Sequence, residues 1–117
     1  MTPVLLPGNM CDARLWTAEV RAALPGAMDA DTTQDDSIAG MAARALAATD
    51  GPLLAVGFSM GAIVALEMAR QAPGRLASAV LIGLNAGADL PERAAHRPVQ
   101  QAEVRAGGLE RVLVEEL

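Results

Sequence analysis

Residues 53–66 read LLAVGFSMGAIVAL. Four apolar residues, 53–56, come before the turn 57–61, and a second apolar run follows from Ala62. The first run has the length of a buried strand, and the second has the composition and length of a helix. We therefore expect a strand, a tight turn and a helix in direct succession.

The turn itself reads G-x-S-x-G, with Ser59 between Gly57 and Gly61. Glycine at these two positions lets other backbone come close, which a strand-to-helix turn this tight requires. The serine hydroxyl would then be exposed at a helix N-terminus, where negative charge is favoured. This is the sequence form of a nucleophile elbow. The alternative is a glycine-rich turn whose serine has no chemical role.

The rest of the first 83 residues alternates between strand-like and helix-like segments. Further strands are expected at residues 4–6, 76–83 and, weakly, 27–32. Helices are expected at residues 13–24, capped by Asp12, and at residues 38–48, capped by Asp36 or Ser37. This alternation predicts an α/β fold with a parallel sheet of about four strands and helices on both faces.

The pattern changes after residue 83. Residues 84–90 read as a loop, and Pro91 suits the first turn of a helix that continues towards Ala106. Pro98 should kink or split that helix. Gly107-Gly108 should end it, and residues 109–117 read as another short helix. We therefore divide the chain into residues 1–83 and residues 84–117.

The motifs and their order resemble the α/β-hydrolase family. The elbow is the most specific feature, and weaker matches are Pro7-Gly8-Asn9 after the first strand, Pro73-Gly74-Arg75-Leu76 before the fourth, and Asp89-Leu90-Pro91-Glu92. The resemblance implies that residues 1–83 are a partial α/β-hydrolase core. Residues 84–117 would be a helical, cap-like segment.

The resemblance also implies hydrolysis of carboxylic esters, with Ser59 as the nucleophile. The oxyanion would be held by the backbone N–H of Met60 and by one from the turn after the first strand. Asn9 is the preferred second donor and Met10 the alternative. No metal and no cofactor is implied. Part of the substrate pocket would be apolar, lined by Met10, Phe58, Met60 and Leu84. The sequence does not identify which ester is the substrate.

The groups that activate such a serine are the weak part of the resemblance. The family's acid and histidine follow the serine in the chain, each after a later strand. The single histidine, His96, lies in a charged helical stretch, and Asp89, Asp31, Asp35 and Asp36 read as loop or cap residues. The sequence therefore favours a truncated N-terminal portion, or a short homologue, with little activity. The alternatives are a non-catalytic binding or assembly module, and a family member with thioester or perhydrolysis chemistry.

Composition narrows the class of partner. The net charge is −5 and all nine basic residues are arginines without a basic stripe, which argues against nucleic-acid binding. No apolar run reaches the ~20 residues of a membrane span, the N-terminus lacks a basic leader, and Cys11 has no second cysteine to pair with. We expect a soluble cytoplasmic protein that acts on a small ester-like substrate. We also expect the protein to self-associate through exposed sheet edges.

Overall fold

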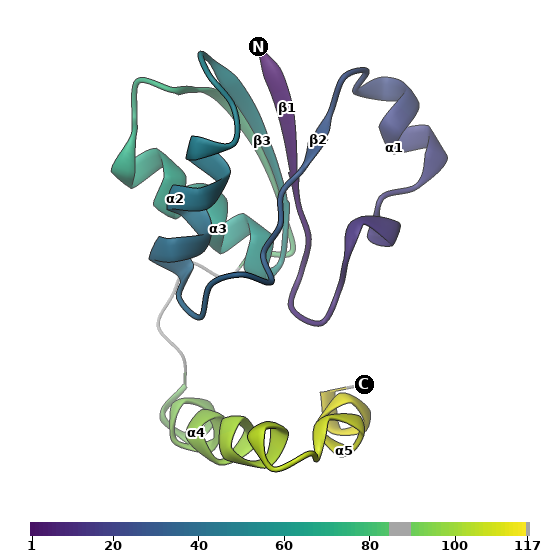
Figure 1. Ribbon diagram of the computed structural model, residues 1–117, viewed down its shortest axis with the longest axis vertical. Helices are drawn as coiled ribbons and strands as arrows, with labels where there is room; N and C mark the ends of the chain where they lie inside the picture. Colours follow the sequence, from purple (N-terminus) through teal and green to yellow (C-terminus); the bar gives the residue numbers. More distant parts are fainter. Residues whose placement is uncertain (85–89, 117) are drawn as a thin grey trace. The chain divides into compact units, whose positions relative to one another are not determined.

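The computed structural model describes residues 1–84 and 90–116, the last two by their backbone alone. The chain forms two compact units, Met1–Asn85 and Ala86–Leu117 (Figure 1). Whether these units correspond to a hydrolase core and a cap stays a prediction. Among the described residues, no helix combines the length and the apolar composition that crossing a membrane requires.

The first unit is built on one sheet whose strands are all parallel. Its strands are β1 (Thr2–Leu6), β2 (Met28–Asp29), β3 (Leu53–Phe58) and β4 (Leu76–Ile82), in the order β2-β1-β3-β4. This confirms the predicted α/β class and the four-stranded parallel sheet. The two central strands are the buried apolar runs of the sequence, because a strand covered on both faces has no polar side to present.

Helices cover both faces of this sheet (Figure 1). They are the 3-10 helix η1 (Ala13–Leu15) and the α-helices α1 (Ala18–Ala23), α2 (Ile38–Ala47) and α3 (Met60–Gln71). On one face Val4, Leu6 and Ala55 pack with residues of α2 and α3. On the other, Leu5 and Val56 pack with Trp16 and with Val20 of α1. The alternation of β1 and β3 side chains thus serves two separate cores.

The single helix expected at residues 13–24 is wrong. Asp12 caps only η1, accepting the Arg14 N–H at 2.9 Å, and the Oγ1 of Thr17 caps α1 by accepting the Val20 N–H at 3.3 Å. Between them Trp16 is extended, with ψ 118°, and its side chain is 7% exposed. The second cap and the burial of the indole against the sheet divide the helix.

Other predicted boundaries are closer to those observed. The cap of α2 is Ser37, whose Oγ accepts the Gly40 N–H at 3.0 Å. The weak strand is shorter than residues 27–32, because Asp31 turns the chain by accepting hydrogen bonds from the N–H and hydroxyl of Thr33.

An arginine fixes the chain between α2 and β3. The guanidinium of Arg75 donates to the carbonyl oxygens of Leu46 and Thr49, both at 2.7 Å, and of Gly51 at 2.9 Å. The last carbonyls of a helix have no partner within the helix, so a cation that reaches them stabilises the helix end. Arg75 therefore ties the end of α2 to the start of β4.

The second unit contains α4 (Pro91–Arg105) and α5 (Leu109–Glu116). The expected split at Pro98 is wrong, because α4 continues through it, and a kink there stays a prediction. Pro98 is exposed, so its ring meets solvent, and its missing N–H costs one helical hydrogen bond. The predicted break at Gly107-Gly108 is confirmed: Gly107 has φ 97°, and the Gly108 N–H donates to the Glu103 carbonyl at 2.8 Å.

Candidate functional site

Ser59 stands at the carboxyl end of β3, directly before α3, in a backbone conformation that side chains rarely adopt. Its φ is 55° and its ψ is −112°, away from the left-handed helical region that non-glycine residues sometimes visit. The Ser59 N–H donates to the Ile82 carbonyl at 2.8 Å, and its own carbonyl accepts from Ala62 at 3.0 Å. Backbone bonds to β4 and α3 therefore hold the serine in this strained turn.

The two glycines of the motif make this turn sterically feasible. A Cβ on Gly57 would lie 2.4 Å from the Gly61 carbonyl oxygen. A Cβ on Gly61 would lie 2.0 Å from the Leu6 carbonyl oxygen and 2.7 Å from that of Pro7. Both clashes are with backbone, which no change of rotamer relieves. The glycines therefore let β3, the start of α3 and the end of β1 pack directly on one another.

The turn after β1 lies against the elbow as a result. Gly8 is so close to the Phe58 ring that a Cβ there would be 2.9 Å from a ring carbon. Asn9 and Met10 follow in an exposed turn, with Met10 at φ 60° and the Cys11 N–H bonded to the Gly8 carbonyl at 3.1 Å. The predicted oxyanion donors thus come from two segments that are in contact. The position of each donor N–H relative to an oxyanion stays a prediction.

The amides proposed for that role are available for hydrogen bonding. Met60 is the first residue of α3, so its N–H has no intrahelical acceptor. Within the described part of the chain, neither this N–H nor that of Asn9 has a hydrogen-bond acceptor. The N-terminus of a 12-residue helix adds a positive partial charge beneath Ser59. The region around the Ser59 hydroxyl is therefore suited to a developing negative charge.

In the part of the chain that the structure describes, no activating group is hydrogen-bonded to Ser59. Across residues 1–84 and 90–116, neither a carboxylate nor an imidazole is hydrogen-bonded to the Ser59 hydroxyl. His96 is exposed on α4, in the second unit, and Asp89 lies outside the described residues. Asp35 pairs with Arg44 at 2.7 Å. The structure therefore brings together the serine and the turn after β1, and among the described residues it places no base in hydrogen-bonding contact with the Ser59 hydroxyl.

The other two candidate acids have surroundings typical of loops. Hydrogen bonds from Thr33, with a further one from Gln34, hold the pKa of Asp31 below its usual value. Asp36 is exposed. A carboxylate whose ionised form is stabilised by hydrogen bonds, as in Asp31, is a poor proton acceptor. Asp31 is therefore a loop residue, as expected, whereas the cap of α2 is Ser37 and not Asp36.

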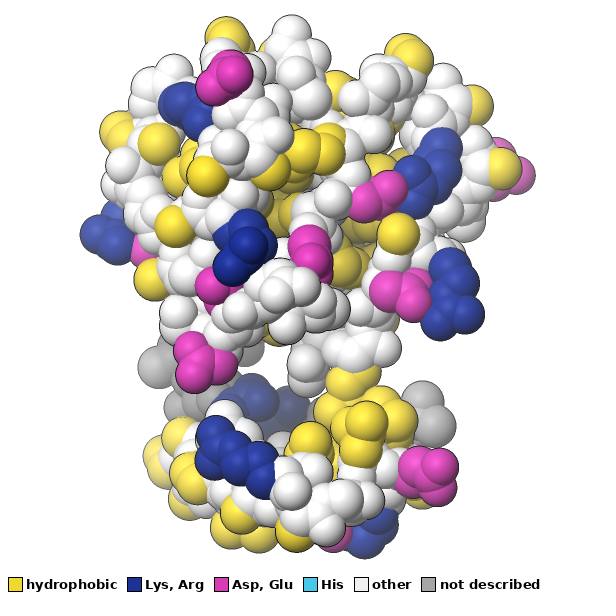
Figure 2. Space-filling view, viewed as in Figure 1, with side chains coloured by type: hydrophobic (Ala, Val, Ile, Leu, Met, Phe, Trp, Pro, Cys, Tyr) yellow, Lys and Arg dark blue, Asp and Glu magenta, His cyan; other side chains and the backbone are white. Residues whose placement is uncertain are grey.

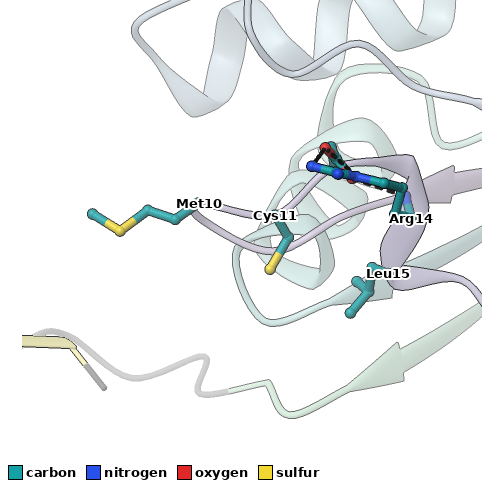
Figure 3. Close-up of a pocket in the computed structure, with 5 residues that line it drawn as sticks. Met10, Cys11, Arg14 and Leu15 are labelled. Carbon is teal, nitrogen blue, oxygen red and sulfur yellow. Dashed lines mark hydrogen bonds and ion pairs between the residues drawn. The ribbon is translucent and has the colours of Figure 1, made fainter. Parts of the chain in front are cut away.

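A shallow pocket of about 300 Å³ lies beside the turn after β1 (Figure 3). It is lined by Met10, Cys11, Asp12, Arg14 and Leu15. Arg14 donates to both carboxylate oxygens of Asp12, which lowers the pKa of Asp12 and keeps it ionised. In Figure 3 the Cys11 sulfur and the Leu15 side chain extend to one side, away from the arginine.

The sequence predicted only one of these pocket residues. Met10 was expected in an apolar pocket, whereas Phe58, Met60 and Leu84 do not line this one. Cys11, Asp12, Arg14 and Leu15 were missed because their meeting depends on how the loop and η1 bend. The described residues contain no group of three or more His, Cys, Asp or Glu side chains that could hold a metal ion. Neither a model of a known protein family nor a curated protein matches the chain.

Proposed function

We propose that this chain is a serine hydrolase of the α/β-hydrolase type that acts on carboxylic esters, with Ser59 as the nucleophile. The observation that carries the proposal is the backbone of Ser59, held at φ 55° and ψ −112°. Such a conformation costs on the order of 1–3 kcal/mol and is concentrated at functional sites. Here the strain exposes a hydroxyl, and the packing of Gly57 and Gly61 maintains it.

In the proposed reaction, the Ser59 oxygen bonds to the ester carbonyl carbon and loses its proton. The carbonyl oxygen becomes an oxyanion that accepts hydrogen bonds from the N–H groups of Met60 and Asn9, with Met10 as the alternative to Asn9. The alcohol then leaves with a proton, and water releases the acid from the acyl-serine. Losing one oxyanion donor typically slows such a step by about 10²–10³-fold.

We assign no acid or base to this site, since no described side chain of either kind is hydrogen-bonded to the Ser59 hydroxyl. The oxyanion site and substrate binding alone can leave a residual acceleration of about 10³–10⁴-fold over water. We therefore expect Ser59 to react with strong acylating or phosphonylating reagents, while turnover of a simple nitrophenyl ester stays far below that of an enzyme with a complete triad.

Labelling with a fluorophosphonate tests this assignment. The folded chain should gain one phosphonyl group, located on Ser59 by peptide mass spectrometry. The label should be lost in Ser59→Ala and kept in Ser78→Ala, which removes an exposed serine hydroxyl from β4. A folded protein that is not labelled, or labelling that survives in Ser59→Ala, would contradict the proposal.

The second candidate is a non-catalytic binding or assembly module that keeps the fold. One observation favours it: the Ser59 hydroxyl has no hydrogen-bond partner among the described residues. A serine without a base is a weak nucleophile. Absence of fluorophosphonate labelling together with a normal unfolding transition would support this candidate over the hydrolase.

A further inference from the structure

The side chain of Phe58 lies between two turns at the carboxyl ends of the strands. β3 is flanked by β1 and β4 in the sheet, and Phe58 is its last residue. One edge of the ring faces the turn after β1, because a Cβ on Gly8 would lie 2.9 Å from ring atom Cδ1 and 3.2 Å from Cε1. The other edge faces the turn after β4, where a Cβ on Gly83 would lie 3.7 Å from Cε2. The ring therefore occupies the space between these two turns.

The core of the first unit holds this ring in place. Phe58 is partly buried, and its side chain packs against the buried cluster of Leu5, Trp16 and Val56. Protein interiors are close-packed and deform little, so a ring held on this cluster presents a fixed surface to its neighbours. The turn after β1 therefore rests on a rigid support at Gly8.

The position of Gly8 determines where the next N–H group lies. Gly8 is buried, and its carbonyl oxygen accepts the Cys11 N–H at 3.1 Å. The peptide bond from Gly8 to Asn9 is trans and planar, so the Asn9 N–H points in the direction opposite to the Gly8 carbonyl. A shift of Gly8 therefore also shifts the Asn9 N–H, which is the preferred second oxyanion donor.

Stabilisation of an oxyanion at this site depends on backbone N–H groups. The arginines of the first unit are engaged elsewhere: Arg14, Arg21, Arg44 and Arg70 pair with carboxylates, and Arg75 binds backbone carbonyls. Figure 2 shows acidic and basic side chains intermixed on the visible side of this unit. The placement of the backbone donors therefore decides how well the oxyanion is stabilised.

We propose that Phe58 is a positioning residue of the oxyanion site, whose ring sets the distance between the N–H groups of Asn9 and Met60. This role rests on the proposed function of Ser59 as a nucleophile. The Phe58 side chain lies against the turn that carries Asn9, and its backbone leads directly to Ser59 and Met60. The ring does not take part in the reaction. A shorter side chain lets the turn after β1 move towards β3, which changes the distance between the two donors.

The kinetics of fluorophosphonate labelling of the whole chain test this role, with the maximal labelling rate (kinact) and the apparent affinity for the reagent (KI) measured separately. Phe58→Leu should lower kinact about 10–100-fold and leave KI unchanged, because a displaced donor weakens the transition state and not the binding of the reagent. Phe58→Tyr keeps the ring atoms that face Gly8 and Gly83, so it should retain the kinact of the unsubstituted chain.

Two further variants separate positioning from lost packing. Gly8→Ala changes the same contact from the other side: its Cβ, at 2.9 Å from the ring, must move by 0.5 Å to reach 3.4 Å, so kinact should fall here too. Leu54→Ala is the matched control, since Leu54 is also partly buried, lies near the other end of β3 and packs against the same cluster. It removes as many carbon atoms as Phe58→Leu, and it should lower stability while keeping kinact.

Nuclear magnetic resonance measures the contact itself and does not depend on the hydrolase assignment. The ring current of Phe58 should displace the α-proton resonances of Gly8 from their usual range. Phe58→Leu should remove this displacement, and Leu54→Ala should keep it. A Gly8 resonance that does not respond to Phe58→Leu would overturn the proposal.

The labelling outcomes distinguish this role from the proposed function. Equal kinact in Phe58→Leu and the unsubstituted chain, a raised KI with unchanged kinact, or slow labelling of Phe58→Tyr would overturn the positioning role and leave Ser59 as the nucleophile. If circular dichroism shows that Phe58→Leu does not fold, Gly8→Ala decides between the same outcomes. A folded, unsubstituted chain that is not labelled would overturn the hydrolase assignment and the role of Phe58 together.

Discussion

Replacing Gly61 by alanine tests the direct contact between the end of β1 and the start of α3. The added Cβ would lie 2.0 Å from the Leu6 carbonyl oxygen, whereas ordinary contact begins at 3.4 Å. The two backbones must therefore separate by 1.4 Å, the difference between those distances. Leu6 is fully buried and pairs with Gly57 of β3, so this movement disturbs both the core and the strand pairing.

The expected loss of stability follows from that movement. Overpacking a core typically costs 1–3 kcal/mol, and a clash of Cβ with backbone should be at the upper end, about 3 kcal/mol. Alanine is the better helix former by about 1 kcal/mol, which offsets part of the loss. We expect Gly61→Ala to lower the free energy of unfolding by about 2 kcal/mol, a large share of the 5–15 kcal/mol typical of a domain.

Urea unfolding followed by circular dichroism measures this change. Gly74→Ala is the matched control, because a Cβ at Gly74 would meet no atom within 4 Å. We expect it to be neutral or slightly stabilising. Under conditions in which both variants are folded, fluorophosphonate labelling should be slower in Gly61→Ala, since the turn after β1 moves away from Ser59. Equal unfolding free energies for the two variants would refute the steric argument.

Three further changes probe separate parts of the first unit. Ser59→Gly should raise the free energy of unfolding by about 1 kcal/mol in urea titrations, because glycine relieves the strained φ; a loss of stability would contradict the strain. Arg75→Ala should lower it by about 2–3 kcal/mol through three lost hydrogen bonds to carbonyls, with Arg75→Lys in between. Hydrogen bonds from Arg70 and then Gln71 lower the pKa of Glu67 to about 2 from 4.5, so Glu67→Gln should be the less stable protein at neutral pH. That difference should vanish as pH falls from 4.5 to about 2, and a pH-independent difference would argue against it.

The secondary structure predicted from the sequence was correct in segments where only one local pattern was present. β3, a tight turn and α3 follow one another directly as expected, because an apolar run on each side of a glycine-flanked turn allows few other structures. Predictions were wrong where signals competed. Thr17 caps a second helix within what reads as one helical pattern. Pro98 does not split α4, because it lies on an exposed face of that helix.

The sequence by itself determined the α/β class and the place of Ser59 between a strand and a helix. Those features depend on residues within a few positions of one another, so composition and spacing encode them. Only the tertiary structure decided that Leu6 and Pro7 lie against Gly61 and that the pocket gathers Cys11 and Leu15. The contact between β1 and α3 joins residues more than 50 positions apart in the sequence. Such features follow from the packing of whole elements, which local pattern does not encode.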